Sequence, residues 1–239
     1  MAFINKETPN MKYFKLVIFV VVIFSFGFKY RPPILEKKTV LNNDSIEMSV
    51  KKIWDESSFK EIVSYDLFQM AMKGYYKYDS FEVGKISIID YSKPSSVKRF
   101  YVIDLKNKSL LFNTLIAHGK NTGENKAIHF SNKPKSLKSS LGFFKTSETY
   151  YGKHGYSMKL DGLEKGINDN ARKRAIVIHG ANYVSAEFVL QNGRLGRSWG
   201  CPALPVSKTK KVIDAINNGT CLFIYGKNEE YLKVSEFLN

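Results

Sequence analysis

Apolar residues recur at helical spacing in the stretch between residues 45 and 74, and this pattern predicts an amphipathic helix. The stripe consists of Phe59, Ile62, Val63, Leu67, Met70 and Ala71. Gly74 follows the stripe and is typical of a helix stop. We expect the helix to lie on the main domain; a helix at a membrane surface is the alternative.

A different pattern follows, in which short apolar runs alternate with turn residues. Such runs predict β-strands, and they occupy residues 84–90, 97–105, 109–117, 141–146, 174–179 and 220–225. One further helix is indicated near the C-terminus, with Ser207 as its cap, Val212, Ile213 and Ile216 as its apolar face and residues 217–219 as its end. The stretch 121–138 is polar and basic, which favours an excursion over the surface. The predicted fold is therefore mainly β with flanking helices.

The first residues have a pattern of their own. Lys12 and Lys15 precede an uncharged apolar run over residues 16–28, and Pro32 ends the segment. This run is too short for an ordinary membrane span of about twenty residues, but it suits the core of an export signal. We expect residues 1–33 to be a signal peptide or a short uncleaved anchor inserted through residues 16–28; a buried core segment is the alternative. Residues 34–83 then form a linker with the helical segment, and residues 84–239 the main domain.

The charge of the chain adds a class of partner. Its 239 residues contain 37 lysines and arginines against 22 acidic residues, a formal net charge of +15. Nucleic acid, an anionic membrane surface and an anionic wall polymer all fit such a charge. The basic residues are spread along the chain without a nucleic-acid motif, so we expect no nucleic-acid partner.

The two cysteines, Cys201 and Cys221, leave several roles open. Cys201 could be half of a disulfide, a buried filler, a metal ligand or a nucleophile. Cys221 lies in an apolar run where a cysteine is usually a small buried side chain. The chain has no pair or cluster of cysteines and histidines at zinc-site spacing. We therefore expect no structural metal site.

His179 directly follows the apolar strand at residues 174–178, and it precedes Gly180. An imidazole at a strand end is rigidly placed for a catalytic base, although a histidine that only caps the strand is the alternative. A thiol becomes a useful nucleophile when a histidine within hydrogen-bond reach favours the thiolate. The pair formed by His179 and Cys201 makes the nucleophile the strongest reading of the cysteine.

The residues around Cys201 fit that role. Gly200 lets the backbone approach a carbonyl closely, and Pro202 stiffens the turn. The N–H groups of Gly200 and Cys201 could donate to an oxyanion, and Ser198 could hold the loop or donate to substrate. In the same loop, Arg194 and Arg197 either hold a substrate carboxylate or are solvated charges.

A strand that ends in His-Gly, followed by a loop and Ser-x-Gly-Cys, resembles the L,D-transpeptidase catalytic (YkuD-type) domain of bacterial cell-wall enzymes. The resemblance extends over roughly residues 95–226. It is carried by the stretches at 138–146, 148–185 and 193–205, the last with Cys-Pro-Ala after the glycine as in a divergent branch of the family. It implies a β-sandwich-like mixed sheet with the active site at one end. It also implies acyl transfer between peptidoglycan stem peptides, without a cofactor.

The resemblance also implies residue roles. Cys201 matches the nucleophile and His179 the base, while the main-chain carbonyl of Gly180 orients the imidazole. Gly200 and Cys201 match the oxyanion-hole positions, and Ser198 matches the serine or threonine three residues before the cysteine. The substrate-binding candidates are Arg197, Arg194, Trp199 and His154. A wall enzyme of this kind is exported, to the periplasm or the outer face of the cytoplasmic membrane of a bacterium.

Two positions depart from the commoner motif. Trp199 stands where that motif has a second histidine, and Ala203 where it has a polar residue, often arginine. These departures leave substrate range open, and they leave hydrolysis by an L,D-carboxypeptidase or a non-catalytic peptidoglycan-binding module as alternatives. A zinc peptidase built from the four histidines, His118, His129, His154 and His179, lacks any matching ligand spacing.

Overall fold

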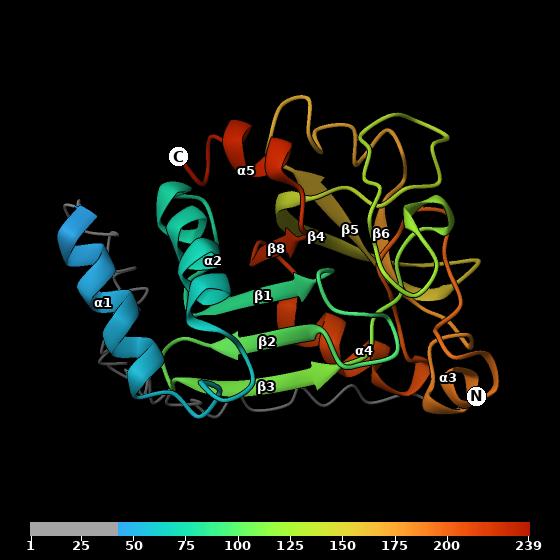
Figure 1. Ribbon diagram of the computed structural model, residues 1–239, viewed down its shortest axis with the longest axis horizontal. Helices are drawn as coiled ribbons and strands as arrows, with labels where there is room; N and C mark the ends of the chain where they lie inside the picture. Colours follow the sequence, from blue (N-terminus) through green and yellow to red (C-terminus); the bar gives the residue numbers. More distant parts are fainter. Residues whose placement is uncertain (1–42) are drawn as a thin grey trace, which may run out of the picture. The chain divides into compact units, whose positions relative to one another are not determined.

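One eight-stranded mixed sheet organises residues 43–239, the part of the chain that the computed structural model describes (Figure 1). Its strands are β1 (Lys85–Asp90), β2 (Phe100–Asp104), β3 (Ser109–Thr114), β4 (Gly142–Gly152), β5 (Gly155–Gly162), β6 (Val177–Gly180), β7 (Ala203–Leu204) and β8 (Cys221–Tyr225). Their order across the sheet is β3-β2-β1-β8-β4-β5-β6-β7. The pairs β1/β8 and β6/β7 are parallel and the others antiparallel. The predicted fold, mainly β with flanking helices, is confirmed.

The middle of the sheet is buried because its strands are nearly continuous apolar runs. Ile86, Ile88 and Ile89 of β1 have no exposed surface, and β8 is buried from Cys221 to Ile224. Burial of each such side chain contributes about 1.5–3 kcal/mol. The two strands pair in parallel although 130 residues separate them, and the intervening chain forms the rest of the sheet. The first and last strands of the chain therefore lie side by side in the middle of the sheet, and the site elements β6 and β7 lie at one edge.

The helical segment before β1 is divided, contrary to the prediction of one helix. It forms α1 (Asn43–Asp55) and α2 (Tyr65–Lys77), joined by a link in which Phe59 and Val63 are buried. Gly74 does not end α2, which continues to Lys77, so that prediction was wrong. A Cβ at Gly74 would lie 2.2 Å from the ring of Phe143, so the glycine makes room for β4 inside the helix.

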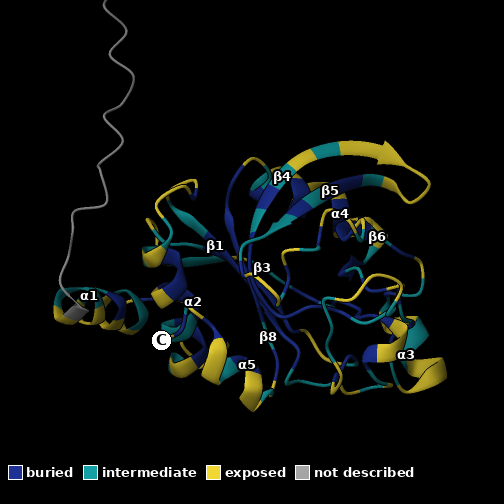
Figure 2. Cartoon of the chain, turned by 90° about the horizontal axis from the view of Figure 1, so that it is seen from above, coloured by how far each residue is buried: buried dark blue, intermediate teal, exposed yellow. Residues whose placement is uncertain are grey.

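The C-terminal helix is α4 (Val206–Ile216), and its apolar face is the predicted one. It begins after Pro205, so Ser207 lies inside the helix and does not cap it. Three short elements complete the structure: η1 (Lys120–Thr122), α3 (Ala186–Asn192) and α5 (Glu229–Val234). In Figures 1 and 2, α1 and α2 lie at one end of the sheet and α3 at the other.

Residues 43–239 all belong to one compact unit, in which α2 packs against β1 and β8. The helical segment expected within residues 34–83 is thus part of the same body as the sheet. No helix within this described part is long and apolar enough to cross a membrane. The export signal or anchor expected at residues 1–33 lies outside the described residues.

A small second core supports the loops at the β6/β7 edge. It is formed by Ala117, Ala181, Val184, Leu195 and Ala203, separately from the main core. Beside this edge, β4 and β5 extend as a long hairpin whose outer part is exposed (Figure 2). The site residues are therefore placed by a sheet edge, a small apolar core and a projecting hairpin.

Candidate active site

His179 lies near the end of β6, and the register of the sheet brings the cysteine loop beside it. His179 pairs with Ala203 of β7, two residues after Cys201, and its backbone N–H donates to the Pro202 carbonyl at 3.4 Å. Two sequence-predicted site residues, 22 positions apart in the chain, are thus held by one strand pair, His179 on β6 and Cys201 in the loop that leads into β7. Gly180 allows this arrangement, because a Cβ there would lie 2.7 Å from Thr209 Oγ1 of α4.

The imidazole of His179 has a defined orientation. It is 3% exposed, and its Nδ1 lies 3.0 Å from the Gly180 carbonyl oxygen. A carbonyl oxygen only accepts, so Nδ1 carries the hydrogen and Nε2 keeps the lone pair. Burial lowers the pKa of His179, and the neighbouring His154 and Lys153 lower it further. His179 is therefore a neutral base at neutral pH, as the role of Gly180 in the sequence analysis requires.

Cys201 is half-buried beside the start of β6. Its Sγ donates to the Ala175 carbonyl at 3.6 Å, and Ala175 has the left-handed φ of +53°. Burial raises the pKa of the thiol, while the Val177 backbone and the charges of Arg174 and Lys153 oppose that rise. No hydrogen bond joins Sγ to the His179 ring among the described residues. The thiol therefore rests in its protonated form against a carbonyl.

Ser198 holds the loop that carries the nucleophile. Its Oγ donates to the Cys201 carbonyl at 2.6 Å and accepts from the Gly200 N–H at 3.0 Å. Gly200 has a φ of +125°, and a Cβ there would lie 3.0 Å from the Lys138 carbonyl, so a side chain would be strained at this position. Because the Gly200 N–H is engaged, the N–H of Cys201 is the more available oxyanion donor.

Arg194 and Arg197 both contact one carboxylate. Glu124 Oε2 lies 2.9 Å from Arg194 Nε, and Oε1 lies 2.6 Å from Arg197 Nη1. Arg197 also donates to the Lys120 and Gly123 carbonyls. The two guanidinium groups thus fasten the 120–124 segment to the cysteine loop, and Glu124 already neutralises part of their charge. Their role in substrate binding stays a prediction.

The turn between β4 and β5 reaches both halves of the site. The ring of His154 stacks on the ring of His179, with centroids 4.5 Å apart and planes 28° apart. Lys153 Nζ lies 5.3 Å from the ring centroid of Trp199, which is 74% exposed. His154 and Trp199, both predicted to bind substrate, are therefore beside the base and the nucleophile. Lys153 was not foreseen from the sequence, because only the hairpin register brings it here.

Arg174 is a second functional candidate that the sequence analysis missed. It directly precedes Ala175, and its guanidinium lies behind Gly200 and is half-buried. Its partners are neutral: the carbonyls of Ser131 and Lys138 and the hydroxyls of Ser136 and Ser140. A cation without an acidic partner beside a thiol favours the thiolate. An arginine just before the strand that ends in His179 was the available signal.

A buried histidine supports the loop from behind. His118 is 1% exposed, and its carbonyl accepts from the Ser198 N–H. Arg99 Nη2 donates to its Nδ1 at 2.8 Å, so Nε2 carries the hydrogen and donates to the Gly123 carbonyl at 3.2 Å. Burial, followed by the charge of Arg99, lowers the pKa of His118 to about 4. With both ring nitrogens engaged, His118 has no lone pair for a metal.

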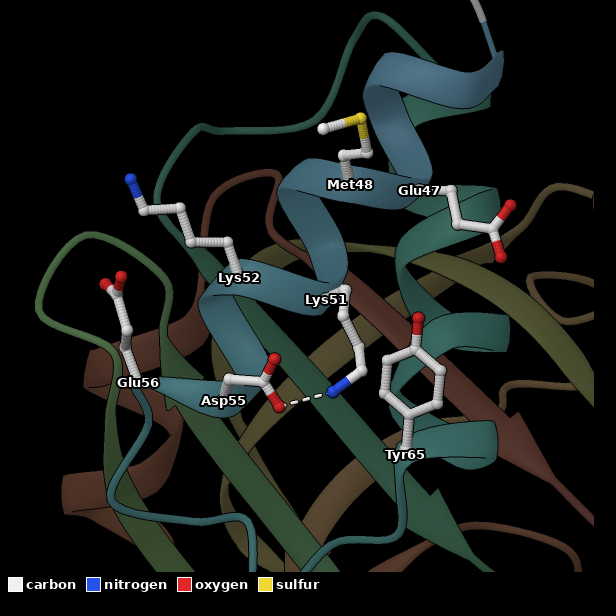
Figure 3. A pocket seen from close by; sticks show the side chains of 7 residues that line it. All are labelled: Glu47, Met48, Lys51, Lys52, Asp55, Glu56 and Tyr65. Atoms are coloured by element: carbon white, nitrogen blue, oxygen red, sulfur yellow. Dashed lines mark hydrogen bonds and ion pairs between the residues drawn. The ribbon is translucent and has the colours of Figure 1, made fainter.

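Neither a metal centre nor a second chemical site is evident in residues 43–239. No three histidine, cysteine, aspartate or glutamate side chains converge there as metal ligands would. A surface pocket of about 660 Å³ lies against α1 and α2 (Figure 3). Its lining includes the ion pair of Lys51 with Asp55 and the ring of Tyr65, and none of the candidate site residues. The chemistry is concentrated at the β6/β7 edge.

The sequence of this chain matches the model of one protein family. The model of the L,D-transpeptidase catalytic domain family matches residues 59–225, more than half of the chain. No curated protein matches the sequence.

Solved structures similar to this chain include three L,D-transpeptidase or cell-shape proteins. An L,D-transpeptidase of Mycobacterium smegmatis is 13% identical over 60% of this chain and 59% of its own, with a TM-score of 0.36. The helical cell shape determining protein Pgp2 of Campylobacter jejuni is 16% identical over 61% and 48%, with a TM-score of 0.40. An L,D-transpeptidase of Stackebrandtia nassauensis is 15% identical over 74% and 78%, with a TM-score of 0.36. The chain thus spans about three fifths of the Mycobacterium smegmatis protein.

Proposed function

The chain belongs to the L,D-transpeptidase catalytic domain family, and from this premise we propose that it transfers acyl groups of peptidoglycan stem peptides through a thioester at Cys201. The single observation that carries the proposal is the placement of His179. Its Nδ1–H is fixed by the Gly180 carbonyl, its Nε2 is free to take a proton, and the register of β6 and β7 sets it beside the cysteine loop.

The proposed reaction has two half-steps. Nε2 of His179 takes the thiol proton, and Sγ of Cys201 attacks the carbonyl between the third residue of a stem peptide and its terminal D-amino acid. The C–N bond breaks, the proton passes to the leaving amine, and a thioester remains. An amine of a second stem then attacks the thioester, the C–S bond breaks, and the proton lost by that amine returns to the thiolate through His179.

Backbone donors and nearby cations support the charged states of this sequence. The Cys201 N–H can donate to the oxyanion of each tetrahedral intermediate. Arg174 and Lys153 favour the thiolate against the effect of burial. Because the resting thiol donates to the Ala175 carbonyl, substrate binding must turn Sγ toward His179 before the first step.

The same site performs hydrolysis if water replaces the amine, which gives an L,D-carboxypeptidase. In the resting site, the Cys201 thiol is hydrogen-bonded to the Ala175 carbonyl and not to His179. This arrangement favours one further alternative, a peptidoglycan-binding module that has lost catalysis. Both alternatives retain stem peptides as the partner. An enzyme acting on peptidoglycan meets its substrate outside the cytoplasm, so we place the domain in the periplasm or at the outer face of the cytoplasmic membrane, held there by residues 16–28 if they are retained.

Incubation with disaccharide-tetrapeptides tests the proposal, with products read by mass spectrometry. The native chain should yield cross-linked dimers or the trimmed tripeptide, and Cys201→Ala should yield neither. Intact-mass analysis should find the acyl or carbapenem adduct on the native chain alone. An adduct that persists in Cys201→Ala would refute the assignment of the nucleophile. Binding of the peptide without product or adduct would favour the non-catalytic module.

A further inference from the structure

The tip of the β4/β5 hairpin brings an exposed cation, Lys153, close to the candidate active site. Lys153 and His154 form the turn between Gly152 and Gly155, the last pair of the β4/β5 ladder. His154 stacks on His179 with centroids 4.5 Å apart, and Lys153 Nζ lies 5.3 Å from the ring of Trp199, two residues before Cys201. One turn therefore contacts both the base and the nucleophile loop.

Lys153 differs from the three arginines around the site in having no acidic or polar partner. Arg194 and Arg197 are paired with Glu124, and Arg174 is enclosed by four neutral acceptors of the 131–140 segment. Within residues 43–239, Lys153 Nζ makes no hydrogen bond or ion pair, and its one contact is the face of Trp199. An aromatic face holds an ammonium group in place and leaves its N–H donors available.

The effect of Lys153 on its surroundings agrees with this position. Its charge lowers the pKa of both the Cys201 thiol and the His179 imidazole, so it lies within electrostatic reach of both groups. A group that binds Lys153 would therefore lie on the same side of the molecule as the two candidate catalytic residues, against the Trp199 ring of the cysteine loop.

We propose that Lys153, held against Trp199, binds the terminal carboxylate of the donor peptide, one residue beyond the bond that Cys201 attacks. This inference rests on the proposed function. The leaving D-amino acid carries its free carboxylate on the same residue as the reacting nitrogen, so the carboxylate must dock close to the thiol. An ammonium–carboxylate hydrogen bond is among the stronger polar contacts in proteins, and a single lysine suffices to select a free carboxylate over a neutral end group.

The position two residues after the nucleophile cannot serve this purpose here. Ala203 has no exposed surface and packs in the small core with Ala117 and Leu195. A charged side chain there would have to be buried without a partner, at a cost of several kcal/mol. The nearby cation on the β4/β5 hairpin, Lys153, lies instead against Trp199.

A binding experiment on the full chain with Cys201→Ala, which prevents turnover, tests the subsite. Calorimetry compares a disaccharide-tetrapeptide that ends in a free carboxylate with the same peptide ending in a carboxamide. We expect the carboxylate peptide to bind about tenfold more tightly, the ratio typical of one charged hydrogen bond. Adding Lys153→Met should abolish that preference by weakening the carboxylate peptide alone, and Lys153→Arg should preserve it.

Lys210 provides the matched control. Its Nζ lies 5.4 Å from the ring of Tyr156 on the α4 side of the hairpin, and it pairs with Asp214. Lys210→Met removes the same charge from a similar aromatic contact and should leave the preference unchanged.

Three results would overturn the subsite: no preference in the parent protein, including no binding of either peptide; equal weakening of both peptides by Lys153→Met; or an equal effect of Lys210→Met. Turnover by the native chain separates this inference from the proposed function. Turnover without a Lys153-dependent preference removes the subsite alone. The preference without turnover removes the catalytic proposal alone.

Discussion

Replacing Ser198 by alanine removes the two hydrogen bonds that its hydroxyl makes to the backbone around Cys201. Ser198 is 5% exposed, and its Oγ bonds the Cys201 carbonyl at 2.6 Å and the Gly200 N–H at 3.0 Å. Alanine has nearly the same shape, so the variant tests these bonds with little change in packing. We expect a less stable domain and a less ordered nucleophile loop.

The size of the effect follows from those two bonds. A typical hydrogen bond contributes about 1 kcal/mol net, and a buried group left without a partner costs about 1–3 kcal/mol. Ser198→Ala should therefore lower the free energy of unfolding by about 2–4 kcal/mol. For a domain of this size, 1 kcal/mol corresponds to about 2–4 °C in Tm, which predicts a decrease of about 4–16 °C.

Thermal unfolding followed by circular dichroism measures this decrease, with Ser207→Ala as the control. Ser207 is exposed in α4, and such surface substitutions change stability by less than about 0.5 kcal/mol. Equal melting temperatures for the two variants would show that the Ser198 bonds do not hold the loop. The rate of Cys201 alkylation, measured below the transition, should change in Ser198→Ala only.

Two further predictions concern titration and the thiols. The folded pKa of His118 is about 4 against about 6.5 in unfolded chains, so between these values the unfolded state binds the extra proton and stability falls as pH falls. His118→Gln is the control, because a glutamine can make the same two hydrogen bonds but does not titrate. Between pH 6.5 and 4, the free energy of unfolding of the native chain, measured in urea, should fall by about 3 kcal/mol more than that of the variant. Parallel plots of unfolding free energy against pH for the two proteins would contradict the pKa. Cys201 and Cys221 are not joined by a disulfide, so a thiol reagent should label Cys201 in the native protein and both cysteines in denaturant without reductant. If neither cysteine reacted in denaturant, the two would be joined by a disulfide, contrary to this prediction.

The strands predicted most accurately are those whose sequence alone required burial. β1 and β8 are continuous apolar runs with few competing interpretations. β5 was missed because its apolar pattern is short: Met158 and Leu160 are buried, while Lys159 between them and Asp161 after them are partly exposed. α3 was missed because none of its residues is buried, and its start depends on the Ser185 cap. The local sequence patterns of β5 and α3 are weak, so these elements form mainly because of contacts with the rest of the fold.

Gly74 shows how a long-range contact can reverse a local rule. A glycine after an apolar stripe is a helix stop by propensity, yet here it lies inside α2 because the Phe143 ring occupies the space of its side chain. Phe143 is 69 residues away in the chain, so the sequence around Gly74 cannot predict this contact.

The residues of the candidate site also fall into two groups, those that local sequence motifs identify and those that only the fold brings together. His179, Gly180, Ser198 and Cys201 come from two short motifs, and the structure brings them to one sheet edge as the sequence indicated. The partner of the loop arginines, Glu124, lies about 70 residues earlier in a stretch that reads only as polar surface. The charged residues can be read from the sequence, but which of them form ion pairs depends on the fold.

The two departures from the commoner motif acquire a physical reason from this charge distribution. Position 199 is exposed and faces Lys153, so a tryptophan there provides an aromatic surface for a cation. The second imidazole beside the base comes from His154, stacked on His179. Position 203 is enclosed in a small apolar core, where a polar side chain would be buried among apolar neighbours. The β4/β5 turn therefore places an imidazole against His179 and a cation against the loop of Cys201. If these two residues carry the proposed reaction, substrate selection should depend on this hairpin more than on the loop that carries the cysteine.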